Sequence, residues 1–368
     1  MVMPGVIGLT LMTGAEAAAT PPGAQLLQET WSTYLRTSVR RNGRVVDEKG
    51  GGHSTSEGQA YAMLRAVWAD DPDAFARIHT WTLRKLQNGD PTALPAWKYG
   101  RRVAFRRILD PSPATDADLL MAWALQLAGE RWDRPDYTDL ARTLARSTYS
   151  RNVVVVGGRH VLLPGPWAKD TDPIRVNPSY FVPFAMRDLD RLDPGIDWTP
   201  VIDDGYAILA EATPDGGLLP DWLYLDPTTG TRVPAPEPAH DLHGFEAMRL
   251  PWTLAAEVAW HNDPRARALL TPYLDWRPFW RQHNWLPAVA HADGSPAVEY
   301  GHLALTGALL PAWGLLDPDA AADLYTSDIA PTLGPDGWDD PADYYAQNWT
   351  WFGIALWTGV AVSSEKTP

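Results

Sequence analysis

The chain has 368 residues, of which 45% are hydrophobic and 21% are charged, and its formal net charge is −14. It contains no long run of Lys or Arg, which argues against nucleic acid, whose phosphate backbone requires a basic surface, and against an anionic membrane surface. The absence of cysteine excludes disulfides and thiolate metal sites, while 19 Trp and 13 Tyr supply flat faces suited to stacking on sugar rings, although most of them are expected to fill helix interfaces.

The beginning of the chain resembles a secretory signal. A short apolar run, VIGLTLM, is followed by TGAEAAATPPG, which contains a small-residue A-x-A site ending at Ala19. The basic segment that normally precedes such a run is missing, and an apolar tail without a targeting role is the alternative. We expect residues 1–19 to be a signal peptide and the protein to be secreted or periplasmic. No other run reaches the ~18 apolar residues of a membrane span, so we expect no membrane insertion.

Residues 20–368 show no low-complexity linker, which predicts a single domain. Apolar residues recur at i, i+3, i+4 and i+7 in segments separated by Pro and Gly, and this spacing predicts helices. The segments include residues 58–69, 73–86, 117–132, 137–149, 200–212, 247–260, 302–316 and 346–360. Strand signals are few: 152–165 is predicted to be a hairpin around Gly157-Gly158, and 218–234 a second one. We therefore expect a mainly α protein whose helices form paired rings, a toroid with a cleft at one end.

The stretch HSTSEGQAYAML, residues 53–64, places one acid at the start of an apolar helix. Ser54, Thr55 and Ser56 are residue types that cap the free N–H groups of a first turn. Glu57 in that turn complements the helix dipole, so a cap is the simplest interpretation.

Two further stretches carry acids at predicted helix starts. In SPATDADLLMAWAL (112–125), Asp116 and Asp118 lie about 200° apart on a helix, so at most one faces a given cleft. Alone, this stretch also has a capping pattern, with Thr115 and Asp116 ahead of the apolar run. In LHGFEAMRLPW (242–252), Glu246 and Arg249 share a helical face as an i, i+3 pair, which is most often a solvated salt bridge. Pro251 is expected to break or kink the helix there.

Three acids at helix starts, flanked by aromatic residues, also fit a general acid, a positioning carboxylate and a general base around a sugar. Aromatic loops lie between them: LPAWKYG (94–100), NPSYFVPF (177–184) and DDPADYYAQNW (339–349). Their candidate stacking or substrate-binding residues are Trp97, Tyr180 and Tyr345, although each loop also serves as a plain connector. Arg249 is a further candidate substrate-binding residue. No phosphate-binding or HExxH zinc motif is present, so we expect no metal and no cofactor.

At these stretches the sequence resembles glycoside hydrolase family 8, and in particular the periplasmic endoglucanases encoded beside bacterial cellulose synthases. The matching pieces follow in order: SEGQAYAM, GDPTALPAWKYG, ATDADLLMAWAL, VNPSYFVPF, FEAMRLPW and DDPADYYAQNW. The resemblance implies an (α/α)6 barrel, a catalytic domain over residues 20–368, and endo-hydrolysis of β-1,4-glucan with inversion. A polysaccharide is then the partner, and we expect a monomer.

The resemblance also assigns roles. Glu57 matches the proton donor, and Asp116 matches the carboxylate that holds the distorted sugar. The usual base is an Asp in a Tyr-Asp-Ala-x-Arg stretch, which here reads Phe245-Glu246-Ala247-Met248-Arg249. Glu246 keeps the carboxylate but moves it by one methylene, roughly 1.5 Å, and Asp241 is the alternative base.

The resemblance leaves open two other activities. In the first alternative, the protein hydrolyses another glycan, such as xylan, chitosan or mixed-linkage glucan. In the second, it binds glycans and its turnover is impaired. If Glu57 is the general acid, its pKa must rise despite the helix dipole, and Asp116 is the expected neighbour that raises it.

Overall fold

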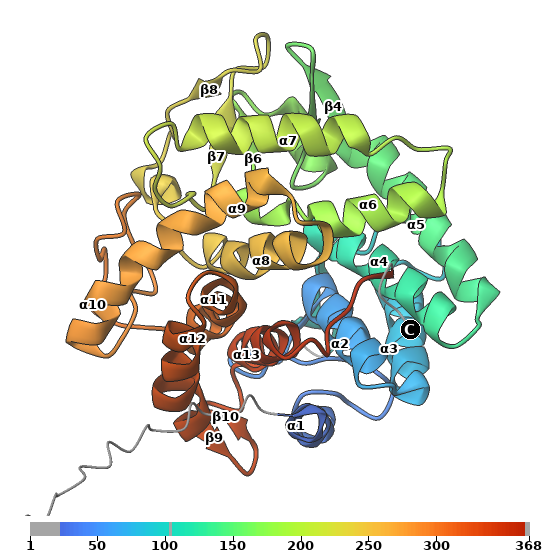
Figure 1. Ribbon diagram of the computed structural model, residues 1–368. Coiled ribbons are helices and arrows are strands. Elements are labelled where there is room, and N and C mark those ends of the chain that lie inside the picture. Colours follow the sequence, from blue (N-terminus) through green and yellow to red (C-terminus); the bar gives the residue numbers. More distant parts are fainter. Residues whose placement is uncertain (1–22, 103–104, 365–368) are drawn as a thin grey trace, which may run out of the picture.

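The computed structural model describes residues 23–102 and 105–364, so the predicted signal peptide at residues 1–19 lies outside the described residues. Within these residues, six helices each contact the next and close an inner ring (Figure 1). They are α2 (Ser56–Trp68), α4 (Thr115–Arg131), α6 (Pro183–Leu192), α8 (Leu250–His261), α11 (Leu303–Leu316) and α13 (Tyr344–Trp357).

A second set of helices packs outside this ring, each against an inner partner. The outer helices are α1 (Ala24–Thr37) on α13, α3 (Pro72–Lys85) on α2, α5 (Pro135–Asn152) on α4, α7 (Thr199–Ala212) on α6, α9 (Pro264–Leu270) on α8 and α12 (Pro318–Leu324) on α11. Helix α10 (Trp276–His283) follows α9 after one 3-10 turn. Paired inner and outer helices around a closed ring are an (α/α)6 barrel, which confirms the expected fold class.

Short sheets decorate the ends of the barrel. Strands β4 (Val153–Val156) and β5 (Arg159–Leu162) form the hairpin predicted around Gly157, and β7 (Leu223–Leu225) pairs with β8 (Arg232–Val233) as the second predicted hairpin. Strand β6 (Ile174–Val176) adds to β7 from a distant segment.

Two further sheets were not predicted. The small sheet β1 (Ser54–Thr55), β2 (Lys98–Arg102) and β3 (Phe105–Asp110) is one, and β9 (Leu333–Gly334) with β10 (Gly337–Trp338) is the other. Strand β3 is largely exposed and both strands are rich in Arg, so neither shows the apolar alternation that marks a half-buried strand.

The centre of the barrel is filled by aromatic side chains. Trp68, Trp123 and Trp252 are buried and contact one another or shared neighbours at ring-centroid distances of 5.0–6.4 Å. Most of the other tryptophans are also buried, so they act in packing, as expected. None of the helices in residues 23–102 and 105–364 combines the length and apolar character that crossing a membrane requires.

Helices α11 and α13 approach closely because each presents a glycine at the crossing. A Cβ built on Gly353 would lie 1.9 Å from the Gly307 carbonyl oxygen, and one on Gly307 would lie 2.5 Å from the Thr350 Cα. Real side chains do not approach backbone atoms so closely, so only glycine fits at this crossing.

We expect Gly353→Ala to lower the free energy of unfolding by about 1–3 kcal/mol, because overpacking forces α11 and α13 apart. Alanine in a helix interior is otherwise favoured over glycine by about 1 kcal/mol, so the sign itself is informative. Urea denaturation followed by circular dichroism measures the change. Gly23→Ala, at the N-cap of α1, is the control for a methyl group added in open space, since a Cβ there would meet no atom within 4 Å. A stabilised Gly353→Ala protein would contradict the packing argument.

Candidate active site

The first turn of α2 brings Glu57 to the mouth of the ring. Thr55 is the N-cap, and its hydroxyl accepts a hydrogen bond from the Gly58 N–H at 3.0 Å, which confirms the predicted cap. Strand β1 pairs with β2 just ahead of the helix, and the Ser56 N–H donates to the Trp97 carbonyl at 2.9 Å. Because these bonds fix the helix start, the Glu57 side chain is held at the groove, where it is 15% exposed.

Helix α4 begins at Thr115 and carries Asp116 in its first turn. The capping interpretation of this stretch is wrong, because the N-cap is Ala114, which has no side-chain cap, and the Thr115 hydroxyl donates instead to a backbone carbonyl. The two acids diverge as predicted. Asp116 contacts the guanidinium of Arg249 at the centre of the site, whereas Asp118 is fully buried away from it.

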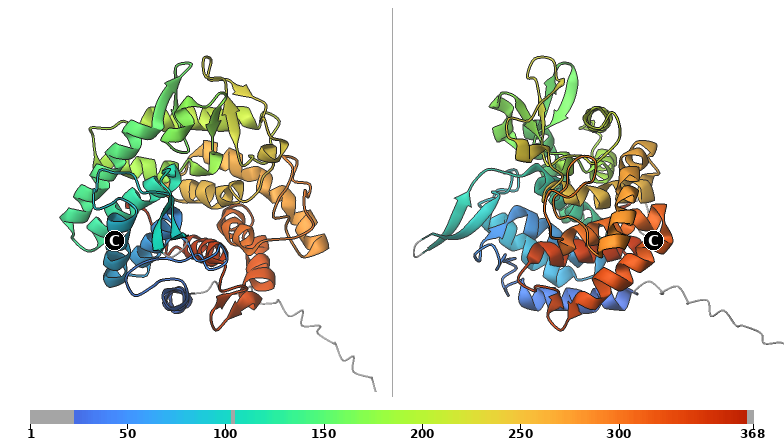
Figure 2. Two further views of the ribbon diagram at one scale, coloured as in Figure 1. Left: turned by 180° about the vertical axis from the view of Figure 1, so that it is seen from behind. Right: turned by 90° about the vertical axis from the view of Figure 1, so that its left-hand side faces the viewer.

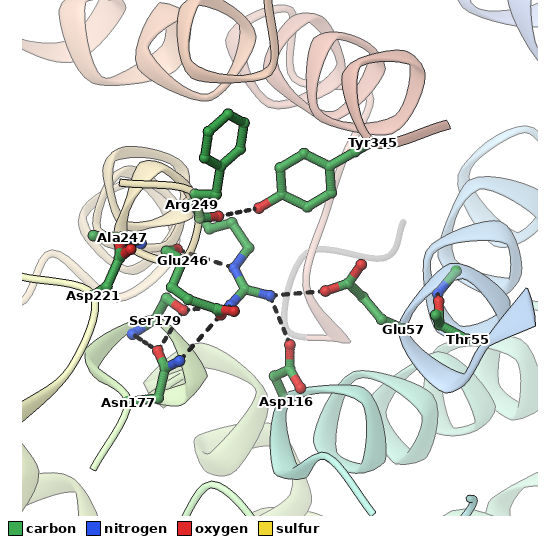
Figure 3. A network of polar contacts seen from close by, with 12 residues as sticks. Thr55, Glu57, Asp116, Asn177, Ser179, Asp221, Glu246, Ala247, Arg249 and Tyr345 are labelled. Atoms are coloured by element: carbon green, nitrogen blue, oxygen red, sulfur yellow. Dashed lines mark hydrogen bonds and ion pairs between the residues drawn. The ribbon is translucent and has the colours of Figure 1, made fainter. Parts of the chain in front are cut away.

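Arg249 is the centre of the cluster (Figure 3). Its Nη1 donates to Glu57 Oε2 at 2.9 Å and to Asp116 Oδ2 at 2.8 Å. Its Nη2 donates to Ser179 Oγ at 2.7 Å and pairs with Glu246 Oε2. The Arg249 side chain is 4% exposed, so three carboxylates from distant parts of the chain share one buried cation.

The local structure around Glu246 differs from the prediction. Residues Ala247–Arg249 form a 3-10 turn, and α8 begins only at Leu250, so the helix expected over 247–260 starts three residues later. Pro251 lies in the first turn of α8, where its missing N–H is tolerated, and it does not break the helix. The interpretation of Glu246 and Arg249 as a solvated salt bridge is also wrong, because the guanidinium is buried.

Asp221 and Asn177 support this turn, and neither was predicted. Asp221 Oδ1 accepts hydrogen bonds from the N–H groups of Gly244 and Ala247, both at 2.8 Å, on either side of Glu246. Asn177 Nδ2 donates to Glu246 Oε2 at 3.1 Å. Asn177 belongs to a motif that the sequence analysis singled out, but Asp221 lies in a stretch where only strand signals were visible.

Two adjacent tyrosines at the start of α13 have different partners. The Tyr344 hydroxyl donates to Glu57 Oε1 at 2.7 Å, whereas the Tyr345 hydroxyl donates to the Phe245 carbonyl at 2.8 Å. The sequence analysis named only Tyr345, because periodicity cannot choose between neighbours in the first turn of a helix. Tyr344 is therefore a site residue that sequence reasoning missed.

Two hollows adjoin at Glu246, which lines both. The first has a volume of about 500 Å³ and is lined by polar groups and tyrosines, including Asp47, Lys49, Glu57, Arg249, His302, Asp343, Tyr344 and Tyr345. The second has a volume of about 390 Å³ and is lined mainly by aromatic rings and turn residues, including Trp97, Trp167, Arg175, Tyr180 and Trp222. The predicted residues Trp97 and Tyr180 thus lie in one hollow and Tyr345 in the other, while Trp167 and Trp222 were not predicted.

The cluster changes the acidity of its members. Burial raises the pKa of Glu57 to about 7; the Arg249 charge opposes this rise, and the Asp116 charge adds to it. Burial also raises the pKa of Asp116 to about 6, again opposed by Arg249 and assisted by Glu246. The expected repulsion from Asp116 is thus present, but burial is the larger cause. One carboxyl that keeps its proton near neutral pH beside a carboxylate is the pairing that acid–base chemistry requires.

Asp241, the alternative base, lies outside the cluster. Its side chain is 48% exposed, lies 3.6 Å from Arg232 and lines a separate hollow. Within residues 23–102 and 105–364, no group of three or more His, Asp or Glu side chains is arranged to hold a metal ion.

Comparison with known proteins finds similar endoglucanases, both by sequence and by structure. The endoglucanase of Escherichia coli (strain K12) is 28% identical over 353 residues, which cover 91% of this chain and 92% of that protein. The endoglucanase of Cellulomonas uda is 34% identical over 68% of this chain and 67% of its own length. The crystal structure of endo-1,4-D-glucanase from Vibrio fischeri ES114 superposes with a TM-score of 0.77 at 27% identity, covering 89% of this chain and 93% of that one.

The family profile described as glycosyl hydrolases family 8 matches residues 5–274, which is most of the chain and includes Glu57, Asp116 and Glu246. The match agrees with the barrel fold and with the acidic cluster at its mouth. The chain belongs to glycosyl hydrolase family 8.

Proposed function

We propose that this glycoside hydrolase is an inverting endo-β-1,4-glucanase. The observation that carries the proposal is the Arg249 cluster, in which Glu57 keeps a proton near neutral pH while Glu246 lies on the other nitrogen of the same guanidinium. The relatives named as endoglucanases support β-1,4-glucan as the substrate. The two adjoining hollows support an endo mode, because a polymer lying in one can continue into the other past Glu246.

In this mechanism Glu57 donates its proton to the glycosidic oxygen as the bond breaks. Glu246 accepts a proton from the water that attacks the opposite face of the sugar, which inverts the anomeric carbon. Its Oε2 is occupied by Asn177 and Arg249, so Oε1 is the oxygen that receives the proton. The hydrogen bonds from Arg249 and Asn177 hold the Glu246 side chain in place.

Asp116 holds the sugar at the cleavage position. Its Oδ2 is fixed by Arg249, and its buried Oδ1 accepts no hydrogen bond from the described residues. A buried carboxylate oxygen without a donor is costly, and a sugar hydroxyl would satisfy it. Trp97, Tyr180 and Tyr345 then provide stacking faces along the groove.

A second candidate, a glycan-binding protein with impaired turnover, is favoured by one observation. Glu246 stands where the usual base is an Asp, so its carboxylate is displaced by one methylene, and Arg249 engages it in the structure. Release of reducing sugar from carboxymethylcellulose supports the hydrolase, whereas retention on the same polymer in an affinity gel without release supports the binding protein. Release of reducing sugar only from xylan, chitosan or mixed-linkage glucan would show that the protein is a hydrolase of the same family with a different substrate.

We also propose that the protein is secreted or periplasmic, on the pattern of residues 1–19, and that it acts in cellulose or exopolysaccharide production. A single domain over residues 20–368 and a monomeric state stay predictions.

We expect Glu57→Gln to lower turnover of a β-1,4-glucan by ~10²–10⁴-fold or more, because the amide cannot donate a proton to the leaving oxygen. Polymer binding in an affinity gel should persist. Glu29→Gln, an exposed change on α1, is the matched control. Turnover of Glu57→Gln at the rate of the unmodified protein would exclude Glu57 as the acid.

The assignment of Glu246 gives a graded prediction. Glu246→Ala should abolish hydrolysis, Glu246→Asp should retain or raise it because it restores the usual reach, and Asp241→Ala should have little effect. Proton NMR during early hydrolysis by the unmodified protein should show the α-anomer first. A first product in the β configuration, or a dead Asp241→Ala with an active Glu246→Ala, would require another base.

The pH dependence should follow the protonation of Glu57. Activity should fall as the pH rises through about 7, because the general acid is lost with its proton. The Tyr344 hydrogen bond stabilises the ionised form and lowers the pKa of Glu57. Tyr344→Phe should therefore shift the basic limb of the kcat/KM profile to higher pH. Tyr345→Phe, which loses a bond only to a backbone carbonyl, is the control, and a shift to lower pH in Tyr344→Phe would refute the assignment.

A further inference from the structure

The hairpin of β2 and β3, called here the basic hairpin, projects from the body of the barrel (Figure 2, right-hand view). Its described residues, Lys98–Arg102 and Phe105–Asp110, carry five cationic side chains and one acid. The whole chain has a net charge of −14. The basic hairpin is therefore a positively charged region on a protein whose net charge is negative.

Three arginines of the basic hairpin are not neutralised by the part of the chain that the structure describes. Arg102, Arg106 and Arg107 are exposed and form no ion pair within these residues. Arg101 and Arg106 lie directly opposite each other across the two strands. The four arginines thus lie close together on the hairpin, and Arg102, Arg106 and Arg107 can pair with an external anion.

The position of the basic hairpin indicates where that anion comes from. Trp97, immediately before β2, and Asp110, the last residue of β3, both line the aromatic hollow beside Glu246. Lys98 Nζ lies 5.3 Å from the Trp97 ring centroid, so the cationic surface begins at the edge of this hollow. Strand β3 has six residues, roughly 20 Å at about 3.3 Å per residue. Arg106 and Arg107 lie in the half of β3 farther from Asp110, so a polymer that leaves the hollow and extends over that length reaches these arginines at the outer end of the hairpin.

We propose that the basic hairpin binds carboxylate groups carried by the glucan chain, so that the enzyme favours an acidic β-glucan over a neutral one. The proposal rests on the proposed function, because it takes the polymer in the groove to be a glucan. Arginine forms paired hydrogen bonds with carboxylates, and several exposed pairs together give a salt-sensitive attraction. The continuity between the hairpin and the groove favours a glycan over a membrane, which would need no such connection.

The test compares carboxymethylcellulose with neutral hydroxyethylcellulose. The triple variant Arg102→Gln, Arg106→Gln, Arg107→Gln should lose roughly tenfold in kcat/KM on the acidic polymer, since each exposed pair contributes modestly, and little on the neutral one. High salt should produce the same selective loss in the unmodified protein. The matched control removes three exposed arginines on α3, α9 and α10 by Arg77→Gln, Arg267→Gln and Arg281→Gln, and should change neither rate.

Binding is measured separately, so that the proposal does not depend on turnover. In native affinity gels, Glu57→Gln should be retarded more by carboxymethylcellulose than by hydroxyethylcellulose, and adding the triple hairpin change should remove the difference. If no polymer is hydrolysed, the proposed function fails while these gels still decide the role of the hairpin. Equal effects on both polymers would overturn the proposal. The proposal would also be overturned if the triple variant lost binding to phosphatidylglycerol vesicles without any change in glycan preference. That result would assign the hairpin to a membrane surface.

Discussion

One buried cation, Arg249, organises the functional end of this molecule. Its guanidinium contacts Glu57 from α2, Asp116 from α4 and Glu246 from the turn before α8. A buried guanidinium without partners would be strongly destabilising, and three carboxylates gathered without a cation would repel one another. The Arg249 cation and the three carboxylates therefore stabilise one another. They can meet only when the inner ring of helices is closed.

This arrangement resolves the conflict at Glu57. The start of α2 and the Arg249 charge both favour the ionised carboxylate, whereas burial and Asp116 favour the protonated one, and burial is the largest effect. Tyr344 donates a hydrogen bond that partly restores the ionised form. The acidity of Glu57 thus depends on how deeply the barrel buries it, and its position depends on the Thr55 cap and the β1–β2 pairing that fix the start of the helix.

The groove is chemically asymmetric on the two sides of Glu246. The side with Tyr344 and Tyr345 is lined by several carboxylates, whereas the other side is lined by aromatic rings and leads to the basic hairpin. Aromatic faces can stack on any sugar ring, while the arginines of the basic hairpin can distinguish glycans by their charged substituents. Under the two proposals above, cleavage and selection of the polymer fall to different elements of the same barrel.

The sequence by itself determined most of the long helices, a cap within residues 54–56, the divergence of Asp116 from Asp118 and, through ordered motifs, the family, because all of these depend on local periodicity or local residue chemistry. Only the tertiary structure decided that Arg249 is a shared buried cation rather than a surface partner of Glu246, and that Tyr344 rather than Tyr345 contacts Glu57. It also brought Asp221 to the turn before α8, left Asp241 outside the cluster and extended the basic hairpin from the groove. These facts depend on contacts between segments up to 287 residues apart, and the spacing of residues along a chain carries no information about which distant segment will face them once the ring has closed.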